Sequence, residues 1–214
     1  YLLETKSKKI SLEALSHLCV ESSARIEFLG LGRSTPMASS LLNGVFTNSE
    51  KTTASILMTA FATISSSLTN SKIKRITRTT SFDIRKIPKE KTIIYLKYPE
   101  YSEQYDGLVS LVLTELIHVL YHSCDQTGQL DIPFHFIIDE FAHFRLPSFE
   151  RYISTARSRN IQFTLLIQSM DQLEIGYSKS VAQTIMDCCQ NIISFQTTNY
   201  NTLTYMSQLS GYRD

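Results

Sequence analysis

Two short apolar runs in the second half of the sequence constrain the fold more than any other feature. The first is Phe134–Ile138, and Asp139 and Glu140 follow it directly. A strand buried on both faces of a parallel sheet has such a nearly continuous apolar run, and open α/β sheets bind ligands at the carboxyl ends of their strands. The two acids therefore indicate a nucleotide-hydrolysing site, in which Asp139 holds Mg²⁺ and Glu140 orients or deprotonates the attacking water.

The second run, Ile161–Ile167, ends in Gln168 and Ser169. If the two strands are parallel neighbours, Gln168 lies in the same crevice as the acids, where its amide can hydrogen-bond a phosphate oxygen and the attacking water. A simpler interpretation remains for each motif alone, since acids also favour the start of a helix and polar residues often end strands. Polar signals after both strands favour the site.

The two halves of the chain differ in their apolar patterns: the first has helical periodicity, and in the second strand-like runs alternate with helical stretches. We therefore predict a helical domain over residues 1–87 and an α/β nucleotide-binding domain over residues 88–214. In the first half, Ser11 and Thr35-Pro36 are signals for helix starts. An apolar stripe with helical spacing predicts a longer helix that starts near Asn48 or Ser49. The stripe consists of Leu57, Phe61, Ile64 and Leu68.

The second half follows a βαβαβαβ pattern, which predicts a parallel sheet with right-handed crossovers. The predicted strands are 92–97, 134–138, 161–167 and 191–196, and the predicted helices are 105–121, 148–158 and 181–188. The helix over 105–121 is apolar on nearly all sides, so we expect it to be buried.

Charge and cysteine content add modest limits. The formal net charge of +1 points to no partner, but basic residues cluster between residues 72 and 91. Lys72, Lys74, Arg75 and Arg78 are candidates for contact with DNA or another anionic partner, and a solvated surface is the alternative.

The four cysteines have no C-x-x-C spacing, which fits a reducing cytosol. No run approaches the roughly 20 apolar residues of a transmembrane helix, and no signal peptide opens the chain.

A metal site at the histidines is not indicated. His118 and His122 lie one helical turn apart but lack the H-E-x-x-H pattern, and a zinc site needs further ligands. His135 and His143 flank the acidic pair and fit local packing or a supporting contact better than metal binding.

The motifs together resemble the motor domain of the VirD4/TraG type IV coupling proteins. The resemblance is specific as a set and covers residues 91–211 well, while the helical half more loosely resembles the all-alpha domain that this family inserts into its RecA-like motor. The matching residues, in order, are Ile137–Ala142, Pro147, Ala156–Arg159, Gln168-Ser169, Gln172-Leu173 and Tyr177.

The resemblance implies a RecA-like sheet and a hexameric ATPase, with ATP and Mg²⁺ as cofactors, that delivers DNA or protein substrates to a type IV secretion channel. Asp139 and Glu140 match the family's Walker B pair, and Gln168 matches its following glutamine motif. Relaxosome and secretion-channel components are the implied partners. The implied place is the cytoplasmic face of a bacterial inner membrane, with this segment soluble and the membrane anchor outside it.

The sequence departs from the family in one respect: it contains no G-x-x-x-x-G-K-[ST] loop. Residues 30–34 resemble a phosphate loop only superficially, because the lysine and a preceding buried strand are missing. We therefore expect the chain to be part of a longer protein and to be inactive as an ATPase by itself.

Arg157 and Arg159 fit two interpretations equally. Basic residues complement the dipole of a helix end, and Asn160 suits the left-handed position that follows it. Either arginine is also a candidate finger that reaches a neighbouring subunit's nucleotide.

Other functions remain open beside a coupling ATPase. They are a translocase of the FtsK or VirB4 type, and a nonenzymatic recognition fragment built on the helical half. The helical insertion and the Asp139–Ala142 sequence favour the coupling family.

Overall fold

The computed structural model describes residues 20, 49–68, 71–77, 82–99 and 105–211, and it divides the chain into two units, residues 1–82 and 83–214. The sequence analysis placed this boundary between residues 87 and 88. The helix starts predicted at Ser11 and Thr35 lie outside the described residues, as do Cys19 and Arg78.

The first unit contains α4 (Glu50–Leu68) and the short α5 (Ser71–Ile76). The predicted start of the long helix is confirmed, because Ser49 precedes α4 and its Oγ accepts a hydrogen bond from the backbone N of Thr52 at 3.3 Å. This contact satisfies one of the free N–H groups of the first turn. The predicted stripe residues Leu57, Phe61 and Ile64 are half-buried.

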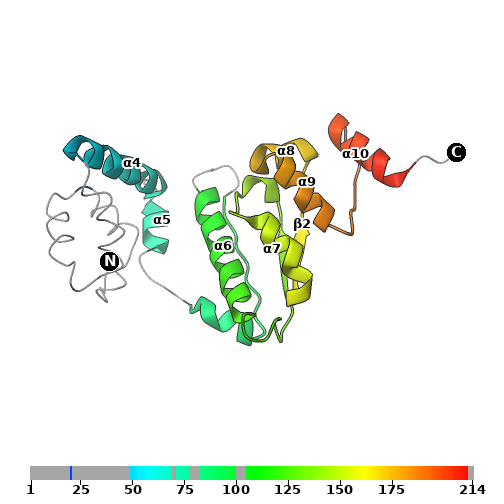
Figure 1. Ribbon diagram of the computed structural model, residues 1–214, viewed down its shortest axis with the longest axis horizontal. Helices are drawn as coiled ribbons and strands as arrows, with labels where there is room; N and C mark the ends of the chain where they lie inside the picture. Colours follow the sequence, from blue (N-terminus) through cyan, green and yellow to red (C-terminus); the bar gives the residue numbers. More distant parts are fainter. Residues whose placement is uncertain (1–19, 21–48, 69–70, 78–81, 100–104, 212–214) are drawn as a thin grey trace. The chain divides into compact units, whose positions relative to one another are not determined.

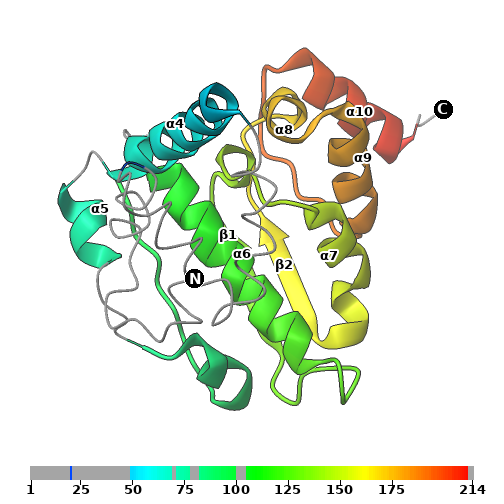
Figure 2. The same cartoon turned by 60° about the vertical axis from the view of Figure 1, so that its left-hand side comes forward.

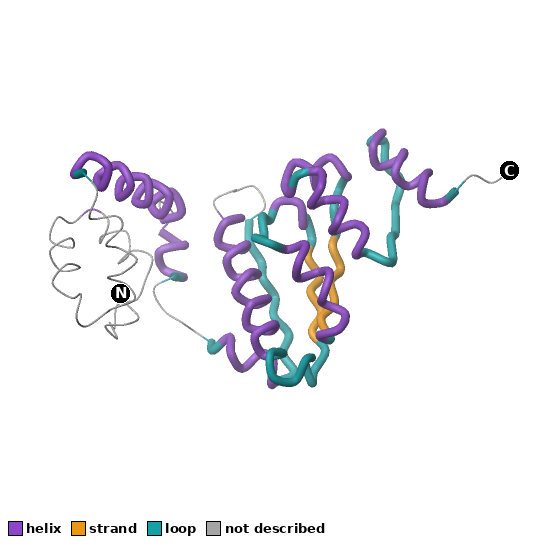
Figure 3. The backbone as a smooth tube through the Cα atoms, viewed as in Figure 1, coloured by secondary structure: helices purple, strands orange, loops and turns teal. Residues whose placement is uncertain are grey.

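The second unit alternates helices and strands (Figures 1 and 3). Its α-helices are α6 (Asp106–Ser123), α7 (Phe149–Ala156), α8 (Met170–Tyr177), α9 (Lys179–Cys188) and α10 (Tyr200–Ser210). Its strands are β1 (Phe134–Ile138) and β2 (Ile161–Leu165), and its short 3₁₀ helices are η1 (Ile84–Lys89), η3 (Phe141–His143) and η4 (Arg157–Arg159).

Strands β1 and β2 form a parallel pair in which Phe134 lies opposite Ile161 and Ile138 opposite Leu165. The parallel arrangement expected from the sequence is therefore confirmed for these two strands. One face of the pair is aromatic, and the rings of Phe136 and Phe163 stack at 4.9 Å with an angle of 12° between their planes. The carboxyl ends of both strands consequently lie at the same edge.

Helices α6, α7 and α9 supply the apolar core that packs on this aromatic face, and Figure 2 shows α6 and α7 flanking the two strands. Phe149 of α7 is fully buried and contacts Phe163 edge-to-face, with ring centroids 5.1 Å apart. On the opposite face the side chains are exposed, including Ile137 at 70%. The helices predicted at 105–121, 148–158 and 181–188 are confirmed as α6, α7 and α9.

Two of the four predicted strands were wrong as strands. Within the described residues the sheet has only β1 and β2, and residues 92–97 and 191–196 have no ladder pairing. The residues around 92–97 still alternate, since Ile94 packs on the core while Ile93 and Tyr95 are 79% and 89% exposed. An apolar run of strand length is therefore not enough for a strand, which also needs hydrogen bonds from a neighbour.

Helices α8 and α10 were missed from the sequence, although each begins with a recognisable cap. Ser169 Oγ accepts from the backbone N of Gln172, in the Ser-x-x-Gln pattern of a capping box. Asn199 Oδ1 accepts from the backbone N of Thr202 at 2.9 Å. These caps place both helices directly after extended segments.

We expect Phe149→Ala to lower the free energy of unfolding by about 3–5 kcal/mol, because it removes a large, fully buried ring and leaves a cavity. Phe195→Ala makes the same chemical change at a side chain that is 86% exposed, so we expect an effect below about 1 kcal/mol. Urea unfolding of the two variants measures the difference. Equal losses would contradict the placement of the core.

Candidate functional site

Three of the predicted catalytic residues, Asp139, Glu140 and Gln168, gather where β1 and β2 end. Two backbone hydrogen bonds extend the pairing past the strands: Leu166 N donates to Ile138 O at 3.0 Å, and Phe141 N donates to Leu166 O at 2.9 Å. The residues between these bonds are Asp139 and Glu140. The ladder therefore fixes the acidic pair beside the segment that leads to Gln168.

Glu140 has a left-handed backbone conformation, with φ 51° and ψ 40°. This region is uncommon for residues other than glycine. Asp139 Oδ1 accepts a hydrogen bond from the backbone N of Glu140 at 3.0 Å, which stabilises the sharp turn. The turn separates the two acids, so that the Asp139 side chain is exposed while Glu140 is half-buried beside β2.

A chain of three side chains links the two strand ends. Gln168 Nε2 donates to Glu140 Oε1 at 2.7 Å, and Gln172 Nε2 donates to Gln168 Oε1 at 3.0 Å. The structure thus places Gln168 against the second acid, as the sequence predicted. Gln172, in the first turn of α8, had no predicted role, although its place in the Ser-x-x-Gln pattern was a usable signal.

Two acceptor atoms at this site are buried and have no hydrogen-bond partner within the described part of the chain: Glu140 Oε2 and Gln172 Oε1. His143 Nε2 lies 4.0 Å from Glu140 Oε2, which is too long for a hydrogen bond. His143 is therefore a near neighbour of the acid, in line with the supporting place expected from the sequence. An unsatisfied buried carboxylate oxygen is a reason to look for a ligand or water.

The turn that carries Glu140 rests on a cluster of aromatic rings. Phe141 is fully buried and stacks on Tyr177 at 5.1 Å, and Phe149 contacts Phe141 at 4.8 Å. The Tyr177 hydroxyl donates to Phe144 O at 2.5 Å and accepts from Leu146 N at 3.2 Å. Desolvation by burial raises the pKa of Tyr177 above its ordinary value, so the hydroxyl stays a donor.

Gly176 allows α8 to approach this turn closely. A Cβ at position 176 would lie 2.7 Å from the backbone oxygen of Ala142 in η3. Only glycine fits such an approach of two backbones. Gly176 thus sets the distance between α8, which carries Gln172, and the turn that carries Glu140.

Arg157 and Arg159 lie at the opposite edge of the strand pair, because η4 precedes the first residue of β2. With a rise of about 3.3 Å per residue, the five residues of β2 place this edge roughly 16 Å from the acids. The Arg159 guanidinium lies 5.1 Å from the centre of the Tyr121 ring, while Arg157 is exposed. The structure does not bring either arginine to Glu140 within this chain.

The helix end at these arginines has the predicted form. Asn160 adopts φ 58° and ψ 32°, the left-handed position that follows the last turn. Its side-chain Nδ2 donates to Leu130 O at 2.9 Å, and the backbone N of Leu130 donates to Arg159 O at 3.1 Å. These bonds tie the residues before β1 to η4.

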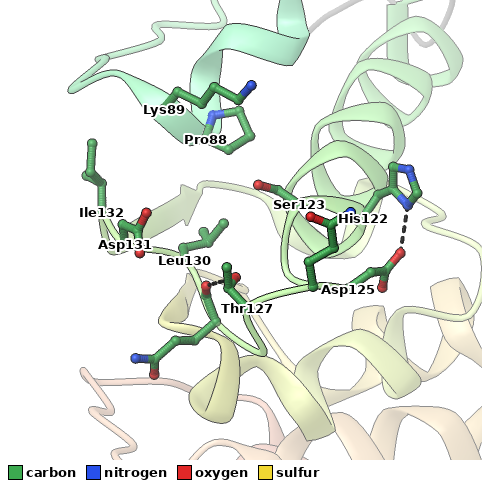
Figure 4. Close-up of a pocket in the computed structure, with 11 residues that line it drawn as sticks. Pro88, Lys89, His122, Ser123, Asp125, Thr127, Leu130, Asp131 and Ile132 are labelled. Atoms are coloured by element: carbon green, nitrogen blue, oxygen red, sulfur yellow. Dashed lines mark hydrogen bonds and ion pairs between the residues drawn. The ribbon is translucent and has the colours of Figure 1, made fainter.

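A pocket of about 470 Å³ lies at the same edge, between η1, the end of α6 and the turn before β1 (Figure 4). Its lining includes Lys89, Asp131 and the pair His122 and Asp125, whose Nδ1 and Oδ2 atoms are 2.7 Å apart. The pocket is far from the acidic pair, at the edge where parallel sheets do not usually bind ligands. It belongs to a different region from the predicted site.

The remaining candidates are not brought to the site. Lys72, Lys74 and Arg75 lie on α5 in the first unit, with Lys72 and Arg75 exposed. His118 contacts the Tyr152 ring at 5.7 Å. Among the described residues no cluster of three or more metal-ligating side chains occurs.

Helix α10 is attached to the first turn of α8 by polar contacts. Asp171 accepts from Asn199 Nδ2 at 2.7 Å and from Asn201 Nδ2 at 2.5 Å, and these bonds lower the pKa of Asp171, the bond from Asn201 most. The backbone N of Met170 donates to Thr202 Oγ1 at 3.1 Å. No side chain of α10 over 200–210 is fully buried, and Tyr200 is 78% exposed.

Comparisons with known proteins agree with this arrangement. Residues 133–214 match a family model described as the TraM recognition site of TraD and TraG. The fold is similar to the solved bacterial conjugative coupling protein TrwBdeltaN70 in its unbound monoclinic form, with a TM-score of 0.65 and 18% sequence identity. The likeness covers 87% of this chain and 42% of that chain, so this chain spans less than half of its length. No curated protein sequence matches.

The resemblance to TraG/TraD-type coupling proteins inferred from the sequence is thus confirmed. The structural likeness shows that the chain shares its fold with part of that protein. Within the described ranges, no helix is both long and apolar enough to cross a membrane.

We expect Gly176→Ala to destabilise the protein by about 1–3 kcal/mol, because the clash with a backbone atom outweighs the roughly 1 kcal/mol that alanine gains in a helix. The matched control is Gly107→Ala in α6, where a Cβ meets nothing within 4 Å. That change should be neutral or slightly stabilising. Chemical denaturation measures both, and a neutral Gly176→Ala would show that α8 and η3 are not held this closely.

Proposed function

We propose that this chain is part of a conjugative coupling ATPase and carries the water-handling half of its nucleotide site. The observation that most supports this proposal is the 2.7 Å hydrogen bond between Gln168 and Glu140, which joins the ends of two adjacent parallel strands. A carboxylate and an amide held together at this edge are the groups needed to orient a water toward a terminal phosphate.

In this mechanism Glu140 accepts a proton from the attacking water or orients it. Its buried Oε2, which has no hydrogen-bond partner among the described residues, is the acceptor that such a water would satisfy. Gln168 is exposed and close to Glu140, so its amide can also contact the terminal phosphate. When hydrolysis removes the terminal phosphate, Gln168 would lose this contact, and the protein would thereby respond to the state of the nucleotide.

Asp139 suits the place of a magnesium ligand. Its carboxylate is exposed, and Mg²⁺ in phosphate-transfer sites is held by one or two carboxylates together with waters and substrate phosphates. A bound Mg²⁺ would neutralise charge on the phosphates during hydrolysis. The phosphate loop would come from another part of the protein, because this sequence contains no such motif.

Arg157 is the better candidate for a finger that acts on a neighbouring subunit. It is exposed, whereas Arg159 already contacts the Tyr121 ring and is half-buried. Both lie too far from Glu140 to act within one chain. This placement fits a ring of subunits, the homo-hexamer that the family resemblance implies, in which one edge of the sheet faces the next subunit's nucleotide.

The whole protein would act at the cytoplasmic face of a bacterial inner membrane and drive DNA or protein substrates into a type IV secretion channel. The basic residues Lys72, Lys74 and Arg75 on α5, with Arg78 after it, are the proposed contact to DNA phosphates. The alternative translocases of the FtsK or VirB4 type would share the acidic pair but not the family match over 133–214.

We expect Glu140→Gln in a full-length protein that carries this chain to keep ATP binding and to reduce turnover by at least about 10²-fold, because it removes the proton acceptor but keeps the shape. Glu115→Gln, at an exposed position of α6, is the matched control and should leave turnover unchanged. Steady-state ATPase assays with a nucleotide-binding titration measure both effects. Near-normal turnover by Glu140→Gln would show that Glu140 is a structural acid.

Partner recognition by α10 is a second function that a separate observation favours. Residues 188–212 contain no Asp, Glu, Lys or Arg, and the exposed side chains of α10 include Tyr200 at 78% and Leu203 at 48%. Interface cores are depleted in charge and enriched in aromatic residues. The matched family is described as a TraM recognition site, so we propose a TraM-like relaxosome protein as the partner of this segment.

We expect the double variant Tyr200→Ser, Leu203→Ser to weaken binding of such a partner at least tenfold in a calorimetric titration, because it removes exposed apolar contacts. Ile93→Ser, at a side chain that is 79% exposed in the segment before α6, is the control for loss of surface apolarity and should leave affinity unchanged. ATP turnover should be the same in all three proteins. Equal partner affinity in the double variant would remove α10 from the interface.

A further inference from the structure

We propose that Gln172 is a positioning residue that fixes which end of the Gln168 amide faces Glu140. This inference rests on the proposed nucleotide site and adds a residue to it. Gln172 lies in the first turn of α8, with its backbone N bonded to Ser169 Oγ at 3.3 Å and its side-chain Nε2 bonded to Gln168 Oε1 at 3.0 Å. Its action on the chemistry would pass through Gln168.

The direction of the two amides follows from hydrogen-bond chemistry. An ionised carboxylate only accepts hydrogen bonds, so the group of Gln168 that contacts Glu140 must be its NH₂. The Gln168 oxygen then necessarily points to Gln172. The contact at 3.0 Å is favourable only if Gln172 presents its own NH₂. The Glu140 carboxylate thus determines the orientation of the Gln168 amide, and the Gln168 oxygen determines the orientation of the Gln172 amide.

The buried oxygen of Gln172 shows that this orientation is imposed. Gln172 Oε1 has no hydrogen-bond partner among the described residues, and a buried acceptor left unpaired is unfavourable. Rotating the amide by half a turn would not relieve this arrangement, because two oxygens would then face each other between Gln172 and Gln168. The unpaired oxygen is the consequence of keeping the Gln168 NH₂ on Glu140.

An acceptor in place of the Gln172 donor would compete with Glu140 for the Gln168 NH₂, so the amide could then turn away from Glu140. The turned amide would present its oxygen to Glu140, where two acceptors repel. Gln168 would then no longer hold its NH₂ toward the water and phosphate. We expect this to lower the rate of the chemical step and to leave ATP affinity nearly unchanged.

Gln172→Glu tests this inference without weakening the helix. A glutamate at position 172 keeps the Ser-x-x-Glu form of the capping box that begins at Ser169, and thermal unfolding checks that the variant is folded. The ionised side chain has no donor for Gln168. In a full-length protein that carries this chain, kcat should fall at least roughly tenfold with KM unchanged. The control Gln126→Glu, at an exposed turn, should have wild-type kcat and KM.

A double variant separates a positioning role from a general one. If Gln172 acts through Gln168, adding Gln172→Glu to Gln168→Ala should lower kcat no further than Gln168→Ala alone. Gln172→Lys restores a donor at the same position and should recover part of the lost kcat. An additional tenfold loss in the double variant, or wild-type kcat in Gln172→Glu, would overturn the inference.

Glu140→Gln measured in parallel distinguishes failure of this inference from failure of the proposed function. If Glu140→Gln is inactive while Gln172→Glu is fully active, only the role of Gln172 is wrong. Full activity of Glu140→Gln would overturn the nucleotide site and the role of Gln172 with it.

Discussion

The parallel pairing of β1 and β2 is the interaction on which the site depends. Its register places Ile138 opposite Leu165, and the two further backbone bonds at Leu166 bring the acidic turn next to the segment that carries Gln168. A shift of either strand by one residue would turn its own phenylalanine, Phe136 or Phe163, away from the core and move Glu140 relative to Gln168. The aromatic face therefore holds the register, and the register assembles the site.

The first turn of α8 connects this site with the C-terminal helix. On one side, Gln172 contacts Gln168, and on the other, Asp171 holds Asn199 and Asn201. Helix α10 has no buried side chain of its own over its described length, so these polar contacts determine its place on α8. The proposed nucleotide site and the proposed partner surface thus share one helical turn. A small movement of α8 would change the contacts of Gln172 at the proposed nucleotide site and those of Asp171 with α10.

The sequence predicted the pair of strand ends because the signals were local and independent. Apolar runs of strand length, each followed by polar side chains, were enough to place Asp139, Glu140 and Gln168 together. The left-handed turn at Glu140 and the close approach at Gly176 were not predictable, since both depend on packing between distant segments. Residues 191–196 have strand-like composition but no pairing partner within the described residues, and propensity does not supply a neighbour.

The position of the arginines shows a second limit of sequence patterns. The spacing between Glu140 and Arg157 is short in the sequence, yet the strand between η4 and Gln168 places them at opposite edges of the sheet. With this topology, either arginine would have to act on a neighbouring subunit's nucleotide if it is a finger, which is the form of finger that the sequence left open. The same topology separates the pocket near His122 from the acidic pair.

The central claim is that Glu140 and Gln168 handle the water that attacks a nucleotide. A crystal structure of the full-length protein with Mg-ADP and a planar mimic of the transferred phosphate would measure it most directly. We expect one ordered water within about 2.6–3.2 Å of both Glu140 Oε2 and the Gln168 amide, in line with the mimic. A mimic bound away from the carboxyl ends of β1 and β2, with no water at Glu140, would contradict the account.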